Sequence, residues 1–263
     1  MITSTPEIHE DDVTKLFGLR IRRMQFSQAS DHLLRIAAQR GNRSQVIVTP
    51  NVDHIVRLDQ QPDFKALYAK ADHIFADGMP IVWASKMTPH PLTERVTGAD
   101  LFVSLCKGAV TKGSSIFILG GMPGQEDELI ASFAKVYPGL KVHIVCPSMQ
   151  FTPDGPEADA AILRIQETRP DILFICLGMP KQEYFAFRYQ REQTSNNCPL
   201  ILCVGAAMEF ALGQKKRAPM WMQKIGLEWF WRLASEPRRL WQRYTIQGSK
   251  FIGILLKERR LHK

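Results

Sequence analysis

Residues 115–137 read SIFILGGMPGQEDELIASFAKVY, and this stretch decides the fold class. It begins with an apolar run, continues through a glycine-rich turn, and ends with the apolar spacing of a helix. Similar short apolar runs recur, separated by helical stretches: 45-QVIV, 73-HIFA, 141-KVHIV, 172-ILFIC and 200-LILCV. Such runs are typical of strands buried on both faces. We therefore predict an α/β fold with an open, mostly parallel, Rossmann-like sheet flanked by helices. An earlier run, 15-KLFGLRIRRM, is predicted to form a further strand or a hairpin at an edge.

The charge of the chain is divided unevenly between a long first part and a short tail. The 263 residues are 45% hydrophobic and 23% charged, which is ordinary for a globular protein. Residues 215–263 hold thirteen Lys and Arg against three Glu, a net of +10, so residues 1–214 carry −2 of the overall +8. Four of the five tryptophans also lie in this tail. We therefore expect an α/β domain at 1–214 and a basic, aromatic-rich appendage at 215–263, with short helices broken at Pro237 and near Gly248.

The sequence lacks motifs for export, for membrane spanning and for metal binding. The first twelve residues carry acidic side chains where a signal peptide needs an apolar core, and no run reaches the roughly 18 apolar residues that span a bilayer. We therefore expect a cytoplasmic protein. The five cysteines form no CxxC pair and lie mostly in apolar runs, which favours buried reduced thiols. Neither HExxH nor an Asp-x-Asp pair occurs, so we expect neither a metal ion nor a cofactor.

Glycines follow two of the predicted strands. Gly120, Gly121 and Gly124 join one strand to a helix, and Gly178 begins the turn after another. Glycine lets the backbone approach a ligand closely, and the helix that follows offers free N–H groups to a phosphate. The loop matches neither GxGxxG nor a Walker sequence, so a tight structural turn is the alternative. Since the carboxyl ends of parallel strands line the ligand crevice, we expect these turns to lie along one edge.

Charged and polar residues also lie where predicted strands end or predicted helices begin. Asp77 follows an apolar run and precedes Gly78, so it could be a general base for a hydroxyl nucleophile or a turn aspartate. Arg95 lies before a helix, where its guanidinium could bind a phosphate or stay solvated. Residues 181–183, Lys-Gln-Glu, open a helix and could orient a substrate, although Glu183 could equally complement the helix dipole.

The basic tail has three interpretations. Lys and Arg interleaved with aromatic residues are typical of a segment held on an anionic lipid surface. The same composition could bind nucleic acid, or its tryptophans could simply pack on the body of the protein. Aliphatic residues in 252–256 exceed what phosphate binding requires, so we favour the membrane surface and do not expect nucleic acid as a partner.

Taken together, eight motifs resemble those of the WecG/TagA/CpsF glycosyltransferases, glycosyltransferase family 26. They are 49-TPN, 77-DG with Trp83 following, 94-ERVTGADLF, 119-LGGMPG, 177-LGMPKQE, 204-VGAAMEF, 217-RAPMWM and 226-GLEWFWRLASEPRRLW. The resemblance implies an inverting, metal-independent enzyme of bacterial surface polysaccharide synthesis. It would move a sugar from a UDP-sugar to an undecaprenyl-diphosphate-linked acceptor, as a peripheral protein on the inner face of the cell membrane.

The same resemblance assigns roles to individual positions. The catalytic residues that it implies are Asp77, Thr49, Asn51, Arg95 and Gln182, with Asp77 as the base. The substrate-binding residues that we expect are Gly120, Gly121, Gly124, Gly178, Lys181, Glu183, Glu209, Arg232, Arg238 and Arg239. In 204-VGAAMEF, Glu209 stands where the family more often has aspartate and Ala206 replaces a glycine, which leaves the donor sugar open.

Two other classes of function are compatible with the residues. One is an oxidoreductase on a Rossmann-type sheet, although the chain lacks GxGxxG and a matching acidic residue about 20 positions later. The other is a polyanion-binding module driven by the tail. The sequence does not choose among glucose, N-acetylmannosamine and its uronic acid as donor sugar, nor fix the acceptor linkage. A homo-oligomer is compatible with it.

Overall fold

A computed structural model of the chain describes residues 12–39, 43–192, 198–214, 218–219, 222, 230–231 and 237–261, with side chains from residue 247 onward in the last segment. Within these residues the main sheet has six strands, and each neighbouring pair is parallel. In order across the sheet they are β4 (His73–Ile74), β3 (Gln45–Val48), β8 (Leu200–Cys203), β7 (Ile172–Cys176), β5 (Ser115–Gly120) and β6 (Lys141–Val145). The predicted α/β class and open parallel sheet are confirmed.

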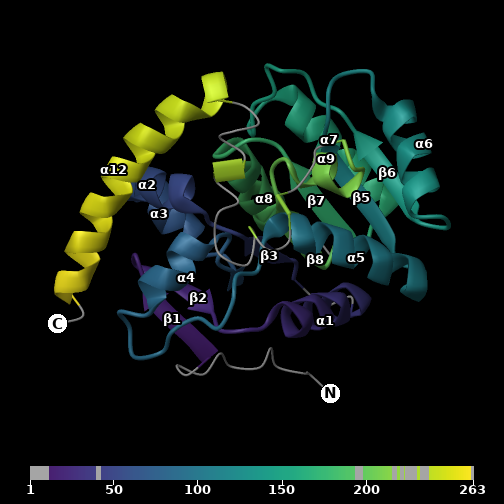
Figure 1. Ribbon diagram of the computed structural model, residues 1–263. Helices are drawn as coiled ribbons and strands as arrows, with labels where there is room; N and C mark the ends of the chain where they lie inside the picture. The colour runs from purple at the N-terminus through teal and green to yellow at the C-terminus, as the bar shows by residue number, and fades with distance from the viewer. Residues whose placement is uncertain are drawn as a thin grey trace.

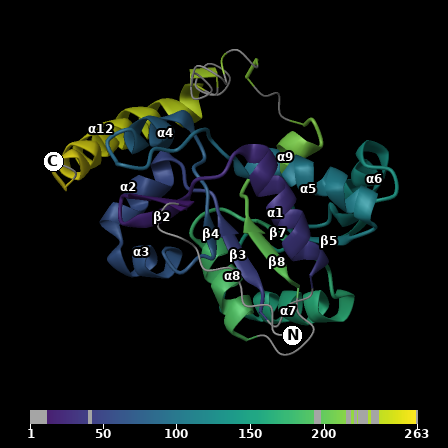
Figure 2. The ribbon, with the colours of Figure 1, turned by 90° about the horizontal axis from the view of Figure 1, so that it is seen from below.

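Helices cover both faces of this sheet (Figure 2). In β3, Val46 and Val48 face one helix layer while Ile47 faces the other, so the strand is apolar throughout. The first layer contains α2 (Val52–Gln60), α3 (Pro62–Tyr68), α4 (Met79–Ser85), α7 (Pro156–Thr168) and α8 (Lys181–Arg191). The second contains α1 (Phe26–Ala38), α5 (Gly98–Lys112), α6 (Glu126–Val136) and α9 (Ala207–Ala211).

An antiparallel hairpin of β1 (Val13–Leu16) and β2 (Leu19–Arg22) lies outside the main sheet, the second of the two alternatives that the sequence left open. Its turn holds Phe17 and Gly18 at φ values of 56° and 72°. The Phe17 ring is buried 5.7 Å from the ring of Phe251, which belongs to the C-terminal helix. The Phe17 N–H donates a 2.8 Å hydrogen bond to Oε1 of Glu258 in the same helix. The hairpin turn therefore anchors the end of the chain.

The C-terminal helix α12 (Pro237–Leu261) lies along the outside of α2 (Figure 1). It begins at Pro237, where a missing N–H costs nothing because the first turn has no intrahelical acceptor. The prediction of a break near Gly248 is wrong, since the helix continues through that residue. Glycine lowers helix propensity by about 1 kcal/mol but keeps its N–H, so packing overrides it.

None of the helices in the described part of the chain is both long and apolar enough to cross a bilayer.

Candidate active site

The ends of β3 and β4 bring the first group of predicted residues together. Thr49, Pro50 and Asn51 follow β3, and Asp77 is the third residue after β4. The Asp77 N–H donates a 2.9 Å hydrogen bond to the Pro50 carbonyl, so the two strand ends are joined at the predicted base. Asp77 is partly exposed and Thr49 is buried. The Asn51 side-chain oxygen accepts from two backbone N–H groups at the start of α2, so its orientation is fixed by capping.

The segment that carries Arg95 lies against the same two strands. The Val96 N–H donates a 2.9 Å hydrogen bond to the Ala76 carbonyl, which places Arg95 beside the strand that leads to Asp77. The helix α5 begins three residues later at Gly98, where an added Cβ would lie 2.8 Å from Oγ1 of Thr49. Only glycine permits this approach. The first turn of α5 therefore packs directly on Thr49, and Arg95 is partly exposed at this edge.

Gln182 joins the ends of β7 and β8. Its Oε1 accepts a 2.9 Å hydrogen bond from the Gly205 N–H, just after β8, and its Nε2 donates a 2.8 Å hydrogen bond to Oε1 of Glu183. Both side chains are buried, Glu183 completely. Gln182 therefore fixes the backbone of the β8 end, while Glu183 lies beneath the strand edge and not on an open surface.

A buried polar cluster connects Glu183 to Asn51. His54 Nε2 lies 3.7 Å from Glu183 Oε1, and His54 Nδ1 lies 2.8 Å from Asn51 Oδ1. Burial raises the pKa of Glu183 to about 7 and, with the Arg57 charge, lowers the pKa of His54 to about 4. Near neutral pH His54 is therefore uncharged, while Glu183 is about half protonated. Glu183 Oε2 is buried without a hydrogen-bond partner in the described part of the chain.

The sequence interpretation missed two members of this cluster, His54 and Tyr68. His54 stands at the third position of α2, directly after the TPN motif, where its ring can reach back to the capping Asn51. Tyr68 is fully buried, and its pKa is raised first by burial and then by the nearby acidic groups Glu183, Cys203 and Asp77. The spacing from Asn51 was a usable signal for His54. Nothing in the sequence pointed to Tyr68.

The glycine turn after β5 lies farther along the same edge. Gly120 and Gly121 have φ values of 152° and 102°, and an added Cβ at Gly120 would lie 2.6 Å from the Cβ of Cys176. The first turn of α6 carries three acidic residues, which already compensate its dipole. In strand order this turn is four positions from Asp77, which corresponds to about 19 Å. A ligand that reaches both must extend across the strand ends.

The remaining predicted residues are scattered around this edge. The Lys181 amino group donates a 3.3 Å hydrogen bond to the Met149 carbonyl, and the exposed Gly178 has open space where a Cβ would lie. Gly124 is exposed in the glycine turn, and Glu209 is partly exposed on α9. Arg232 lies outside the described residues, as do the side chains of Arg238 and Arg239 in α12. In the part of the chain that carries described side chains, no group of three or more His, Cys, Asp or Glu could hold a metal ion.

Comparisons with known proteins point to one family. A sequence profile described as the glycosyl transferase WecG/TagA/CpsF family matches residues 14–263. The chain is also similar to a protein of Bacillus spizizenii (strain W23), named N-acetylglucosaminyldiphosphoundecaprenol N-acetyl-β-D-mannosaminyltransferase. The two are 32% identical over 222 residues, which cover 83% of this chain and 81% of the relative.

Proposed function

Since the chain belongs to the WecG/TagA/CpsF family of glycosyl transferases, we propose that it transfers a hexosyl or N-acetylmannosaminyl-type sugar from a UDP-sugar to an undecaprenyl-diphosphate-linked saccharide. The product would serve bacterial surface polysaccharide synthesis. The relative is named for transfer of N-acetylmannosamine onto a diphosphoundecaprenol-linked N-acetylglucosamine, which supports both the sugar type and the lipid acceptor. Family membership argues against the oxidoreductase and the polyanion-binding module.

The donor extends along the carboxyl ends of the strands in this proposal. The nucleoside lies toward the glycine turn at Gly120–Gly124 and the turn at Gly178, and the transferred sugar lies toward Asp77. The separation of about 19 Å between the two ends of the edge suits an extended nucleotide-sugar better than a compact ligand. The diphosphate then passes over the β7, β8 and β3 ends, where Gln182 binds the Gly205 N–H and Thr49 lies against Gly98.

The chemical step is a single displacement. Asp77 removes the proton from a hydroxyl group of the acceptor sugar, and that oxygen forms a bond to the anomeric carbon. The bond from this carbon to the UDP oxygen breaks, and UDP leaves with the electron pair. Attack from the face opposite UDP inverts the configuration. The observation that carries this role is the position of Asp77, partly exposed and hydrogen-bonded to the β3 end beside Thr49 and Asn51.

Positive charge from the protein stabilises the leaving diphosphate in the proposal, without a metal ion. Arg95 lies in the segment that packs beside Asp77. Arg232, Arg238 and Arg239 are further candidates from the family resemblance, and Arg238 and Arg239 belong to the first turn of α12. Preorganised cations near a developing negative charge lower the barrier more than flexible ones, since no reorganisation is needed during the reaction.

The basic tail also holds the enzyme at the inner face of the membrane in this proposal. The described end of α12 exposes Lys250, Lys257, Arg259 and Arg260 together with apolar side chains. Each Lys or Arg near an anionic surface contributes about 1 kcal/mol to binding. Residence on the membrane would raise the effective concentration of a lipid-linked acceptor.

A donor and acceptor screen tests the function. The full chain is incubated with UDP-linked glucose, N-acetylmannosamine or N-acetylmannosaminuronic acid and a polyprenyl-diphosphate-linked N-acetylglucosamine, with and without a chelator. We expect one donor to give a lipid-linked disaccharide and an equal amount of UDP, with inverted anomeric configuration and no loss in the chelator. UDP release from none of the donors, or a product of retained configuration, would contradict the proposal.

A further inference from the structure

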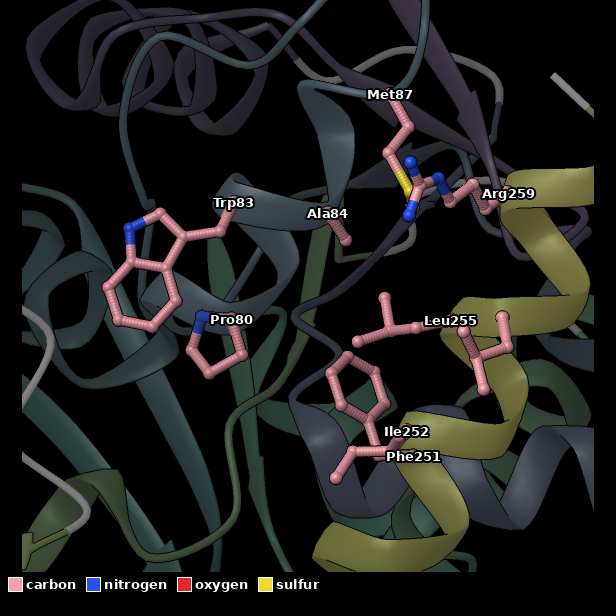
Figure 3. Close-up of a pocket in the computed structure, with 9 residues that line it drawn as sticks. Pro80, Trp83, Ala84, Met87, Phe251, Ile252, Leu255 and Arg259 are labelled. Carbon is pink, nitrogen blue, oxygen red and sulfur yellow. The ribbon is translucent and has the colours of Figure 1, made fainter. Parts of the chain in front are cut away.

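A groove with apolar walls runs between α4 and α12. Its volume is about 360 Å³, within the range of small-molecule sites. Figure 3 shows Pro80 and Trp83 on one wall and Phe251 and Ile252 facing them across the gap. Met87 and Arg259 lie together at one end. Arg259 is the charged residue among those that line the groove.

Both walls present large apolar side chains to solvent. Trp83 is 45% exposed on α4, while Ile252 and Leu256 are 59% and 57% exposed on α12. Apolar side chains scattered singly over a surface need no explanation, but a contiguous set that lines a groove marks a binding site. The ligand of this groove should therefore be apolar along most of its length.

The groove begins next to the predicted base. The helix α4 starts two residues after Asp77, so Pro80 lies at the Asp77 end of the groove and Met87 at the far end. On the other wall, residues 251 to 259 of α12 rise by about 12 Å. A molecule whose sugar lies at Asp77 could therefore continue into the groove and run along it toward Arg259.

Contacts with the β1–β2 turn and with α2 hold the opposite wall in place. Phe251 packs against Phe17, and Glu258 accepts a hydrogen bond from the Phe17 N–H. Lys257 also lies 3.6 Å from Asp59 of α2. The groove is therefore formed before a ligand arrives, which lowers the entropic cost of binding a flexible chain.

We propose that this groove binds the first isoprene units of the polyprenyl chain of the acceptor. The inference rests on the proposed function, which places the acceptor sugar at Asp77. It names the part of the acceptor that the α4–α12 groove recognises. A polyprenyl chain is apolar, narrow and joined to the acceptor sugar through the diphosphate, so one molecule would occupy both the catalytic edge and the groove. Arg259 and its exposed neighbour Arg260 would then face the anionic lipid surface from which the chain emerges.

The test compares two acceptors that carry the same sugar diphosphate, one on a long polyprenyl chain in detergent micelles and one on a short water-soluble alkyl chain. We expect Trp83→Ser and Leu256→Ser, from opposite walls, each to lower kcat/KM for the long-chain acceptor about tenfold, mainly through KM. For the short-chain acceptor kcat/KM should stay at the wild-type value. Leu163→Ser, at an equally exposed position on α7, is the matched control and should change neither.

Other outcomes would overturn the inference. Equal losses with both acceptors would mean that the variants disturb the catalytic edge, and no loss with either would mean that the groove does not bind the chain. Loss of binding to phosphatidylglycerol vesicles with an unchanged KM in micelles would assign the groove to bilayer insertion. A change of oligomeric state in the variants would assign it to a second copy.

Direct binding separates this inference from the proposed function. If the wild type transferred sugar to neither acceptor, the proposed function would fail. Binding of polyprenyl diphosphate without a sugar would then still test the groove. We expect the Trp83→Ser variant to bind it about tenfold more weakly than the wild type and the Leu163→Ser control. Equal affinity of all three proteins would contradict the inference.

Discussion

At the scale of single residues, the most informative group is the carboxyl group of Glu183. It is fully buried between Gln182 and His54, and burial raises its pKa to about 7. In the unfolded chain a glutamate has a pKa of about 4.3. Between these values the folded protein binds more protons than the unfolded chain, so the free energy of unfolding falls as the pH rises through this window.

The Glu183→Gln variant lacks this titration but keeps a hydrogen-bonding side chain of the same size. We expect the wild type to lose about 3 kcal/mol of unfolding free energy relative to the variant between about pH 4.5 and pH 7. Urea unfolding at several pH values measures it. The depressed pKa of His54 acts in the opposite direction, and both proteins contain His54, so its contribution largely cancels in the comparison. Glu128→Gln, at an exposed position on α6, is the control, and a pH-independent difference for Glu183→Gln would contradict the expectation.

Residue types at strand ends could be predicted from the sequence, but their burial could not. Asp77 and Asn51 follow apolar runs, so their position at the edge of the sheet was predictable. Whether Glu183 points to solvent or beneath the edge depends on how α8 rotates against α2, which no local pattern encodes. The same tertiary packing brings Tyr68 into range of Glu183 and Asp77.

At the scale of elements, the turn after β5 shows why glycine is needed at a strand end. Gly120 has a φ of 152°, and an added Cβ would lie 2.6 Å from the Cβ of Cys176 and 2.8 Å from its carbonyl oxygen. These atoms belong to the neighbouring strand β7, so they cannot move without disturbing the sheet. Gly139 also has a positive φ, 86°, but its added Cβ would meet nothing within 4 Å.

This contrast predicts that alanine substitutions at the two glycines lower the free energy of unfolding by different amounts. Gly120→Ala should lower the free energy of unfolding by about 3 kcal/mol, because backbone strain and the clash add together. Gly139→Ala should lower it by about 1 kcal/mol, from strain alone. Chemical denaturation of the two variants measures both values, and equal costs would show that β7 yields easily at this turn.

Helices and strands were predictable where the spacing of apolar residues and the positions of turn-forming residues indicated the same element. The buried strands followed from apolar runs, whereas the run at 15–24 left a strand or a hairpin open and the structure forms the β1–β2 hairpin, with its turn at Phe17 and Gly18. The continuity of α12 through Gly248 did not follow, because a local helix penalty of about 1 kcal/mol is outweighed by packing against α2 and Phe17. Strand order in the sheet was also outside what local patterns encode.

At the scale of the whole molecule, the basic tail is joined to the α/β core. Phe251 belongs to the same buried cluster as residues of β3, α2 and α8, and Glu258 accepts a hydrogen bond from the β1–β2 turn. The division into domains at residue 214 stays a prediction. α12 connects the proposed membrane contact to the first layer of the core, and its C-terminal half forms one wall of the groove beside α4. The catalytic edge and the proposed lipid site therefore share the α4 wall.

The most direct measurement is the rate of sugar transfer by the Asp77→Asn variant. With the UDP-sugar that the wild type uses and a polyprenyl-diphosphate-linked acceptor, we expect kcat to fall about 10²- to 10⁴-fold while binding of the UDP-sugar is retained. Asp63→Asn, at an exposed position in the first turn of α3, should keep the wild-type kcat. An Asp77→Asn variant that transfers the sugar as fast as the wild type would contradict the role of this carboxylate as the base.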